Sequence, residues 1–102
     1  MTLMQLLYAV TIADTKSINK AAEKLFVSQP ALSGAIKDLE DEIHINIFIR
    51  NNRGIVVTTE GEEFLRYARQ MVELNYLINE RFIIKNIEKK KRQIHYIKRH
   101  DV

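Results

Sequence analysis

The chain has 102 residues, of which 46% are hydrophobic, and a formal net charge of +3 at pH 7. It contains no cysteine, which excludes disulfides, thiolate metal sites and thiol redox chemistry and favours a reducing cytoplasm. No apolar run approaches the roughly 18 residues of a membrane span, and residues 3–13 do not resemble a signal peptide. We expect one small soluble domain plus an extended element, with little room for a catalytic cleft.

The positive charge is concentrated at the C-terminal end. Residues 85–102 carry seven basic and two acidic side chains, whereas residues 1–84 carry nine basic and eleven acidic ones. The net charge is therefore weak support for nucleic-acid binding. A phosphate-binding surface would have to come from local placement of basic side chains on one side of the fold. The candidates are Lys16, Lys20, Lys37, Arg50 and Arg53.

Three helices are predicted first. Apolar residues at helical spacing predict the first over about residues 2–14. Ser17 is suited to cap a second over about residues 18–25, and Ser28 a third over about residues 29–43.

The second and third helices are separated by only a few residues. Pro30 fits the first turn of the third helix, where its missing N–H costs nothing. Helices joined by so short a turn cross steeply and leave one face of the third pointing outward, as in a DNA-binding helix-turn-helix. That face is small and polar, and carries Gln29, Pro30, Ser33, Gly34, Lys37 and Asp41.

A β-hairpin is predicted next. Residues 45–50 and 55–58 are rich in β-branched side chains and flank residues 51–54, whose asparagines and glycine tolerate the positive φ of tight turns. Because a lone hairpin is marginal in water, it is expected to lean on the helices. The result is a winged helix-turn-helix over residues 1–58, with Arg53 at the wing tip.

A long helix is predicted over residues 59–91, beginning at a capping box between Thr59 and Glu62. A domain this small cannot bury a helix of that length. A heptad seam with one polar member favours a partner helix, so the segment is assigned to dimerisation. The seam residues are Phe64, Ala68, Met71, Asn75, Ile78 and Phe82.

The remaining residues, 92–102, form a basic tail. Residues 94–97 alternate apolar and polar side chains like the start of a strand, which suggests that a further domain begins there. The predicted fold class is mainly α: three helices and a two-stranded β wing, followed by a long dimerisation or linker helix.

These residues together resemble the N-terminal DNA-binding region of the LysR-type bacterial transcriptional regulators. The resemblance covers residues 1–65 by motif, and the later helix is similar to the family's linker helix. Its most specific part is the segment 27–33 with Ile36, Leu39 and Glu40 after it. The other matching positions are Leu3, Gln5, Leu6, Tyr8, residues 17–22, Leu25, Phe48, Arg50, Arg53, Thr58 and Gly61.

The resemblance implies a sequence-specific DNA-binding transcriptional regulator that binds an inverted-repeat operator in double-stranded DNA as a homodimer. Family members are usually much longer and end in an effector-binding domain. Residues 92–102 would be the start of that domain, and no effector site, cofactor or metal is expected in this chain. A full-length parent could assemble as a tetramer. RNA polymerase is a further candidate partner.

Two positions depart from the family's usual residues. His44 stands where a glycine usually closes the recognition helix, so that helix end has to be stabilised in another way. Gly34 stands where many members have a long polar or basic side chain, which removes a candidate contact to guanine.

Each candidate on the recognition helix has a structural alternative. Ser28 caps the helix and is expected to contact a phosphate as well, while Gln29 can pair with adenine. Pro30 and Ala31 either touch a thymine methyl group or only shape the helix start. The remaining candidates are Ser33, Gly34 and Lys37, the last being otherwise an ordinary solvated lysine.

Four basic candidates lie outside that helix. Arg53 is expected to enter an A·T-rich minor groove, the alternative being an exposed turn arginine. Arg50 either binds phosphate or pairs with Glu40 or another local acid. Lys16 and Lys20 are candidates for contacts to the phosphate backbone.

Two functional classes remain. The first is a DNA-binding module that dimerises through residues 59–91. The second is a protein-interaction module whose winged domain has lost its DNA affinity, which Gly34 and the acidic balance of residues 1–84 favour. The intact motif at 28–33 and Arg53 favour the first more strongly. An enzyme is not expected, because the three histidines lack metal-ligand spacing and no nucleophile or phosphate-cradling motif is present.

Overall fold

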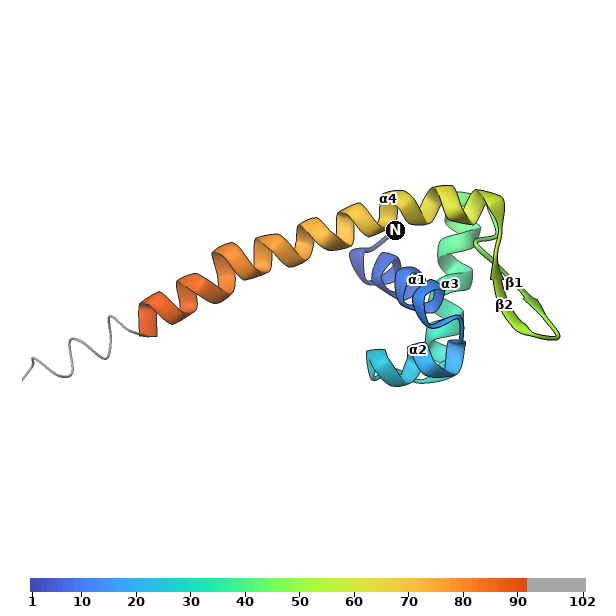
Figure 1. The fold of residues 1–102 in the computed structure, drawn as a ribbon, viewed down its shortest axis with the longest axis horizontal. Coiled ribbons are helices and arrows are strands. Elements are labelled where there is room, and N and C mark those ends of the chain that lie inside the picture. The colour runs from blue at the N-terminus through green and yellow to red at the C-terminus, as the bar shows by residue number, and fades with distance from the viewer. Residues whose placement is uncertain (92–102) are drawn as a thin grey trace, which may run out of the picture. The chain divides into compact units, whose positions relative to one another are not determined.

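The computed structural model of the protein describes residues 1–91 and confirms the mainly helical, winged architecture. The chain divides into two compact units, one from Met1 to Val72 and one that begins at Glu73. Residues 85–91 are α-helical, whereas the strand expected at 94–97 lies outside the described residues. The elements are α1 (Leu3–Thr15), α2 (Ile18–Leu25), α3 (Gln29–Ile43), β1 (Phe48–Asn51), β2 (Gly54–Val57), α4 (Thr59–Ile78) and the π-helix η1 (Asn79–Ile84) (Figure 1).

The first three helices begin at side-chain caps. Thr2 and Gln5 form a reciprocal capping box at the start of α1, which begins one residue later than predicted. The hydroxyl groups of Ser17 and Ser28 each accept a hydrogen bond of 3.2 Å from the backbone N–H three residues later. The predicted caps of α2 and α3 are therefore confirmed. None of the described helices is long and apolar enough to cross a membrane.

The same three helices end at residues in the left-handed region of backbone space. Lys16, Phe26 and His44 have φ values of 56°, 57° and 59°. Glycine adopts this conformation freely, whereas it costs other L-residues about 1 kcal/mol or more. His44 thus ends α3 with the backbone geometry that a glycine usually provides, which is how this chain closes its recognition helix.

The core of the first unit joins all four α-helices. Leu65 and Ala68 of α4 belong to the same buried cluster as residues of α1, α2 and α3. Because of this packing the first compact unit runs on to Val72, past the end of the wing. The largest fully buried side chains are those of Leu6, Ile12, Leu32, Leu39 and Ile47.

The wing is shorter than predicted, and its turn closes differently. Of the three turn residues that tolerate a positive φ, only Gly54 adopts one, of 122°, within the hairpin, all of which is described. The Asn51 side chain instead accepts a hydrogen bond of 2.9 Å from the N–H of Arg53. The antiparallel pairs are Phe48 with Val57, Ile49 with Val56, Arg50 with Ile55, and Asn51 with Gly54.

Ile47 explains why β1 begins later than predicted. Its N–H donates to the Glu40 carboxylate at 2.6 Å, and the N–H of Phe48 donates to the same oxygen at 3.3 Å. The carbonyl of Ile47 accepts from the N–H of Thr58 at 3.0 Å. The Thr58 bond follows the register of the hairpin, whereas the Ile47 N–H is held by α3 and is not available to the strand ladder.

Thr58, rather than Thr59, caps α4. The Thr58 hydroxyl accepts from the N–H of Gly61 at 2.8 Å and donates to the carbonyl of Asn46. The N–H of Glu62 donates to the Thr58 carbonyl at 2.9 Å. The predicted capping box between Thr59 and Glu62 is therefore wrong, because contacts with the segment before the wing place the capping residue one position earlier.

Some residues of the predicted dimer seam pack on the core of the first unit, whereas others are exposed. Ala68 is only 2% exposed and lies in the core of its own unit, so its place in the seam is wrong. Phe64 is partly buried against the same core. By contrast, Met71, Ile78 and Phe82 are 50%, 54% and 56% exposed. The helix is also not one uninterrupted α-helix, because η1 is a π-helix.

The two glycines of the helices allow a matched test of this packing. A Cβ atom at Gly61 would overlap the carbonyl oxygen of Ile47, whereas one at Gly34 would meet nothing within 4 Å. We expect Gly61→Ala to lower the free energy of unfolding by about 2 kcal/mol. Gly34→Ala should raise it by about 0.5–1 kcal/mol through helix propensity. Urea unfolding followed by circular dichroism measures both, and equal shifts would contradict this account of Gly61.

Candidate nucleic-acid interface

The N-terminal half of α3 presents the predicted recognition residues to solvent. Ser33 is half-buried, and it is the only one of them that the structure covers in part. Ser28 already binds the N–H groups of Ala31 and Leu32, and Pro30 has none, so it is mainly the positive end of the helix dipole that favours a phosphate here. The exposed members are Ser28, Gln29, Pro30, Ala31, Gly34 and Lys37.

Acidic side chains limit this surface toward the other end of α3. Residues 29–36 carry no charge, whereas residues 38–42 include four acidic side chains. Asp41, which the sequence places on the outward face, is exposed among them. Only the N-terminal half of α3 can therefore approach a polyanion without electrostatic repulsion.

A shallow groove of about 390 Å³ adjoins the N-terminal end of α3. It lies between the start of α2, the first residue of α3 and the wing, all within the first unit. Among residues 1–91, those that line it include four basic side chains and no acidic one. We call it the basic groove, and its basic residues are Lys16, Lys20, Arg50 and Arg53.

Arg50 reaches the basic groove because of its place in the hairpin register. Alternation along β1 puts it on the same face as Phe48, which packs against the core, and opposite to half-exposed Ile49. One guanidinium nitrogen of Arg50 donates to the Ser33 hydroxyl at 3.5 Å. Arg50 and Ser33, seventeen residues apart in sequence, are therefore brought together across the junction of α3 and the wing.

The alternative pairing of Arg50 with Glu40 is wrong. The Glu40 carboxylate accepts hydrogen bonds from two backbone N–H groups at the start of the wing. Within residues 1–91 the ion pairs join Asp14 to Arg69 and Glu42 to the N-terminal amine. The positive charge of Arg50 is therefore not neutralised by an acidic side chain of the described chain.

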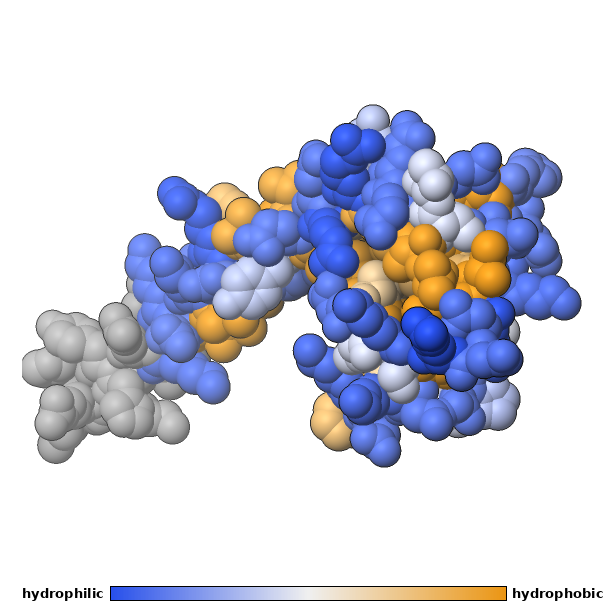
Figure 2. Space-filling view, turned by 45° about the vertical axis from the view of Figure 1, so that its right-hand side comes forward, coloured by the Kyte–Doolittle hydropathy of each residue, from blue (hydrophilic) through white to orange (hydrophobic). Residues whose placement is uncertain are grey.

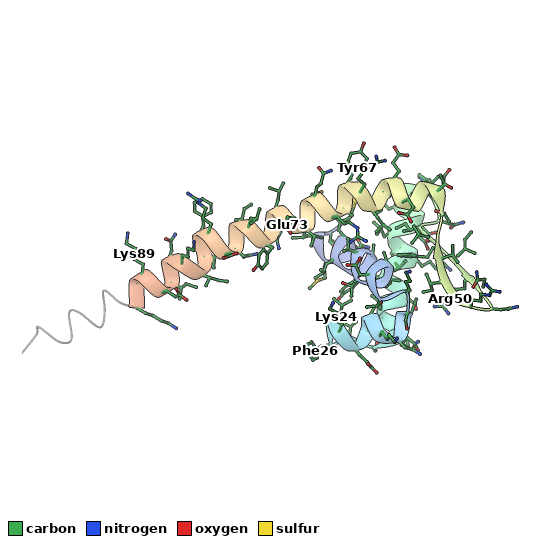
Figure 3. All side chains as sticks on the ribbon, in the orientation of Figure 1. Lys24, Phe26, Arg50, Tyr67, Glu73 and Lys89 are labelled. Atoms are coloured by element: carbon green, nitrogen blue, oxygen red, sulfur yellow. The ribbon has the colours of Figure 1, made fainter. Side chains whose placement is uncertain are left out.

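Arg53 lies in the turn of the wing, where the sequence places it, and is exposed. Figure 3 shows Arg50 on the same hairpin, while Lys24 and Phe26 lie at the C-terminal end of α2. Lys24 is not among the residues of the basic groove, although it is on the same helix as Lys20. Of these two lysines on α2, only Lys20, which is nearer the start of the helix, therefore lines the basic groove.

Sequence reasoning missed three polar residues of this surface, one of which, Ser17, was expected only as a helix cap. Asn19 and Asn51 both line the basic groove beside its lysine and arginine side chains. Asn19 lies in the first turn of α2, directly before Lys20. Its position beside a candidate phosphate-binding lysine is the sequence signal that could have identified it. Asn51 was assigned to the turn alone, and only the register of the hairpin places it at the groove.

Glu40 offers a test of how the wing is held. Glu40→Ala removes a charged acceptor from two N–H groups, so we expect the free energy of unfolding to fall by about 2–3 kcal/mol. Asp38→Ala, an exposed acid on the same helix, should change it by less than about 0.5 kcal/mol. Thermal or urea unfolding distinguishes them, and a neutral Glu40→Ala variant would contradict the assigned role.

Comparisons with known proteins agree with this geometry. A model of the family described as "Bacterial regulatory helix-turn-helix protein, lysR family" matches residues 3–62. A probable RuBisCO transcriptional regulator of Guillardia theta is 47% identical over 73 residues, which are 72% of this chain and 24% of that protein. The chain spans about a quarter of the length of the curated relatives it matches.

Solved structures of DNA-bound domains are similar as well. The crystal structure of a CbnR DNA-binding domain with DNA has a TM-score of 0.73 and 33% identity, and the match covers 79% of this chain and 93% of that one. A BenM DNA-binding domain with catB site 1 DNA has a TM-score of 0.70 and 30% identity, over 93% and 97% of the two chains.

Proposed function

We propose, from the premise that this chain belongs to the lysR family of bacterial regulatory helix-turn-helix proteins, that it binds an inverted-repeat operator in double-stranded DNA as a homodimer. The chain contains the DNA-binding domain of a LysR-type transcriptional regulator. In the proposed arrangement α3 enters the major groove and the wing tip enters the adjacent minor groove.

The basic groove is the observation that carries this proposal. Four positive charges from two segments, residues 16–20 and 50–53, converge beside the start of α3, although residues 1–84 carry more acidic than basic side chains. A fold without a polyanionic partner gains nothing from this convergence, because like charges repel. Four phosphate contacts per domain give a slope of about −7 for the logarithm of the dimer's affinity against that of salt concentration.

The recognition helix supplies the sequence-reading contacts in this proposal. Gln29 pairs with adenine, while Pro30 and Ala31 contact a thymine methyl group. Ser28 adds a phosphate contact to its role as cap, and Lys37 contacts the phosphate backbone farther along. Ser33, held by the Arg50 guanidinium, contacts a base or phosphate in a fixed orientation.

Gly34 has a different role on that surface. A glycine within a helix costs about 1 kcal/mol relative to alanine, yet here no neighbouring atom requires it. On the exposed face of α3 its missing side chain lets the helix backbone approach the DNA closely. This explains the departure from the long polar residue common in the family without loss of DNA binding.

The proposed assembly uses the rest of the chain for dimerisation. Residues 1–58 form the DNA-binding domain, residues 59–91 the dimerisation helix, and residues 92–102 the start of a further domain. A tetramer of a full-length parent, contact with RNA polymerase and a cytoplasmic location complete the proposal, and no catalytic role is part of it. Curated relatives are transcriptional regulators, which supports this assignment.

Selection from a random duplex library tests the wing assignment. Arg53→Ala should weaken binding to sites with A·T-rich flanks by about 1–3 kcal/mol, because a narrow minor groove attracts arginine most strongly. On sites with G·C-rich flanks the loss of affinity should be much smaller. Ser33→Asp should abolish binding to both kinds of site. Footprinting on the selected sites measures these effects as loss of protection. Equal losses on the two flanks would contradict minor-groove insertion.

Salt dependence tests the basic groove itself. Lys20→Ala should reduce the magnitude of the dimer's salt slope by about 2, one phosphate contact for each domain. Lys24→Ala, which removes the same charge from the same helix outside the groove, should leave the slope unchanged. Fluorescence anisotropy at several salt concentrations gives both slopes. A chain that dimerises but binds no duplex even at low salt would favour the protein-interaction module instead.

A further inference from the structure

One hydrogen bond joins the wing to the recognition helix. A guanidinium nitrogen of Arg50 donates to the hydroxyl oxygen of Ser33 at 3.5 Å. Arginine has only donors, so the Ser33 oxygen has to be the acceptor of this bond. A bond of this length is weak, but the positive charge of Arg50 still orients the hydroxyl dipole. The oxygen turns toward the guanidinium and the hydrogen turns away from it.

The hydrogen of the Ser33 hydroxyl has no acceptor within residues 1–91. A serine or threonine inside a helix can donate to the backbone carbonyl four residues earlier. In α1, Thr11 donates in this way to the Leu7 carbonyl at 2.8 Å, and Thr15 donates to the Thr11 carbonyl at 2.9 Å. Ser33 makes no such bond in the described chain, although it is half-buried. Its proton is therefore left for an acceptor that the chain does not provide.

The register of the wing brings Arg50 to Ser33. The preceding residue, Ile49, and its cross-strand partner Val56 are 54% and 48% exposed and lie on the outer face of the hairpin. Figure 2 shows hydrophobic side chains among the hydrophilic ones at the surface of the first unit. Because side chains alternate along a strand, Arg50 projects from the opposite face, toward α3. A side chain of the recognition helix is thus oriented from outside that helix.

Arg50 and Ser33 differ in what they can bind. Arg50 has further N–H donors and a full positive charge, so a nearby phosphate is bound better by Arg50 than by a neutral hydroxyl. Ser33 belongs to residues 29–36, which carry no charge. Its neighbour Gly34 has no side chain, and nothing lies within 4 Å of the place of a Cβ atom there. The backbone of α3 can therefore approach a major groove closely enough for a short serine side chain to reach a base edge.

We infer that Ser33, oriented by Arg50, donates a hydrogen bond to the N7 atom of a purine and so reads sequence. The inference rests on the proposed DNA binding, which leaves base and phosphate open as partners of Ser33. N7 is an acceptor in both purines and takes no part in Watson–Crick pairing, whereas guanine O6 and thymine O4 already accept a bond from the paired base. Cytosine presents a donor at this edge, which would leave the Ser33 proton unpaired.

Purine analogues in the DNA test this contact. 7-Deazaguanine and 7-deazaadenine have a C–H group in place of N7 and keep Watson–Crick pairing. In a site selected from the random duplex library, each purine of one half-site is replaced in turn, and fluorescence anisotropy gives the affinity. At one purine the replacement should weaken binding of the wild-type chain by about 3- to 10-fold, the worth of one hydrogen bond. In Ser33→Ala the same replacement should change affinity by less than about 2-fold.

The two arginines of the wing give a matched control. Arg50→Met removes the charge that orients Ser33, so replacing N7 at that purine should then change affinity by less than about 2-fold. Arg53→Met removes the same charge from the same hairpin but has no contact with Ser33. It should keep the full loss of about 3- to 10-fold on N7 replacement. Both variants weaken binding overall, so the response to the analogue, and not the affinity alone, reports on the orientation of Ser33.

The outcomes separate this inference from the DNA binding on which it rests. If every purine keeps its analogue effect in Ser33→Ala, Ser33 does not read N7, and the inference is overturned while DNA binding stands. Equal analogue effects in Arg50→Met and Arg53→Met overturn the role of Arg50. A wild-type chain that selects no duplex overturns the proposed function and this inference with it. Far-ultraviolet circular dichroism of each variant, with unchanged helix content expected, ensures that the comparison reports on the contact.

Discussion

The position of the wing depends on the peptide unit of Ile47. Its side chain is fully buried, its N–H is bound by the Glu40 carboxylate, and its carbonyl accepts from Thr58. The close approach of Gly61 to the same carbonyl then fixes the start of α4. Because a buried peptide group must keep its hydrogen bonds, the loss of any one of these contacts costs stability. Once the start of the wing is fixed in this way, the strand register determines which side chains of the hairpin reach the basic groove.

Local placement of charge matters more in this chain than its total. The first 84 residues are slightly acidic, yet the basic groove contains basic side chains from the α1–α2 turn, α2 and β1 and from the wing turn. The acids of α3 are gathered in its second half, where they repel a polyanion. The acidic half of α3 is thus separated from the basic groove, which adjoins the other end of that helix.

The long helix serves two packing roles in succession. Leu65 and Ala68 complete the core of the winged unit, whereas the apolar side chains of the second unit remain exposed. A heptad pattern read from the sequence joins both groups, because it records spacing and not what the side chains contact. The pattern also assumes an uninterrupted α-helix, and the π-helix η1 breaks that assumption.

The sequence by itself determined the features that depend on neighbours a few residues away: the helices, the Ser17 and Ser28 caps, the hairpin and the position of Arg53 in its turn. Local hydrogen bonds and side-chain periodicity are written directly in the chain. Only the tertiary structure decided that Glu40 binds the Ile47 and Phe48 amides instead of Arg50, that Thr58 caps α4, and that Ala68 is buried. The Glu40 carboxylate reaches the wing across the end of α3, Thr58 is held by the Asn46 carbonyl, and Ala68 packs on the other helices, so these contacts depend on how the elements pack.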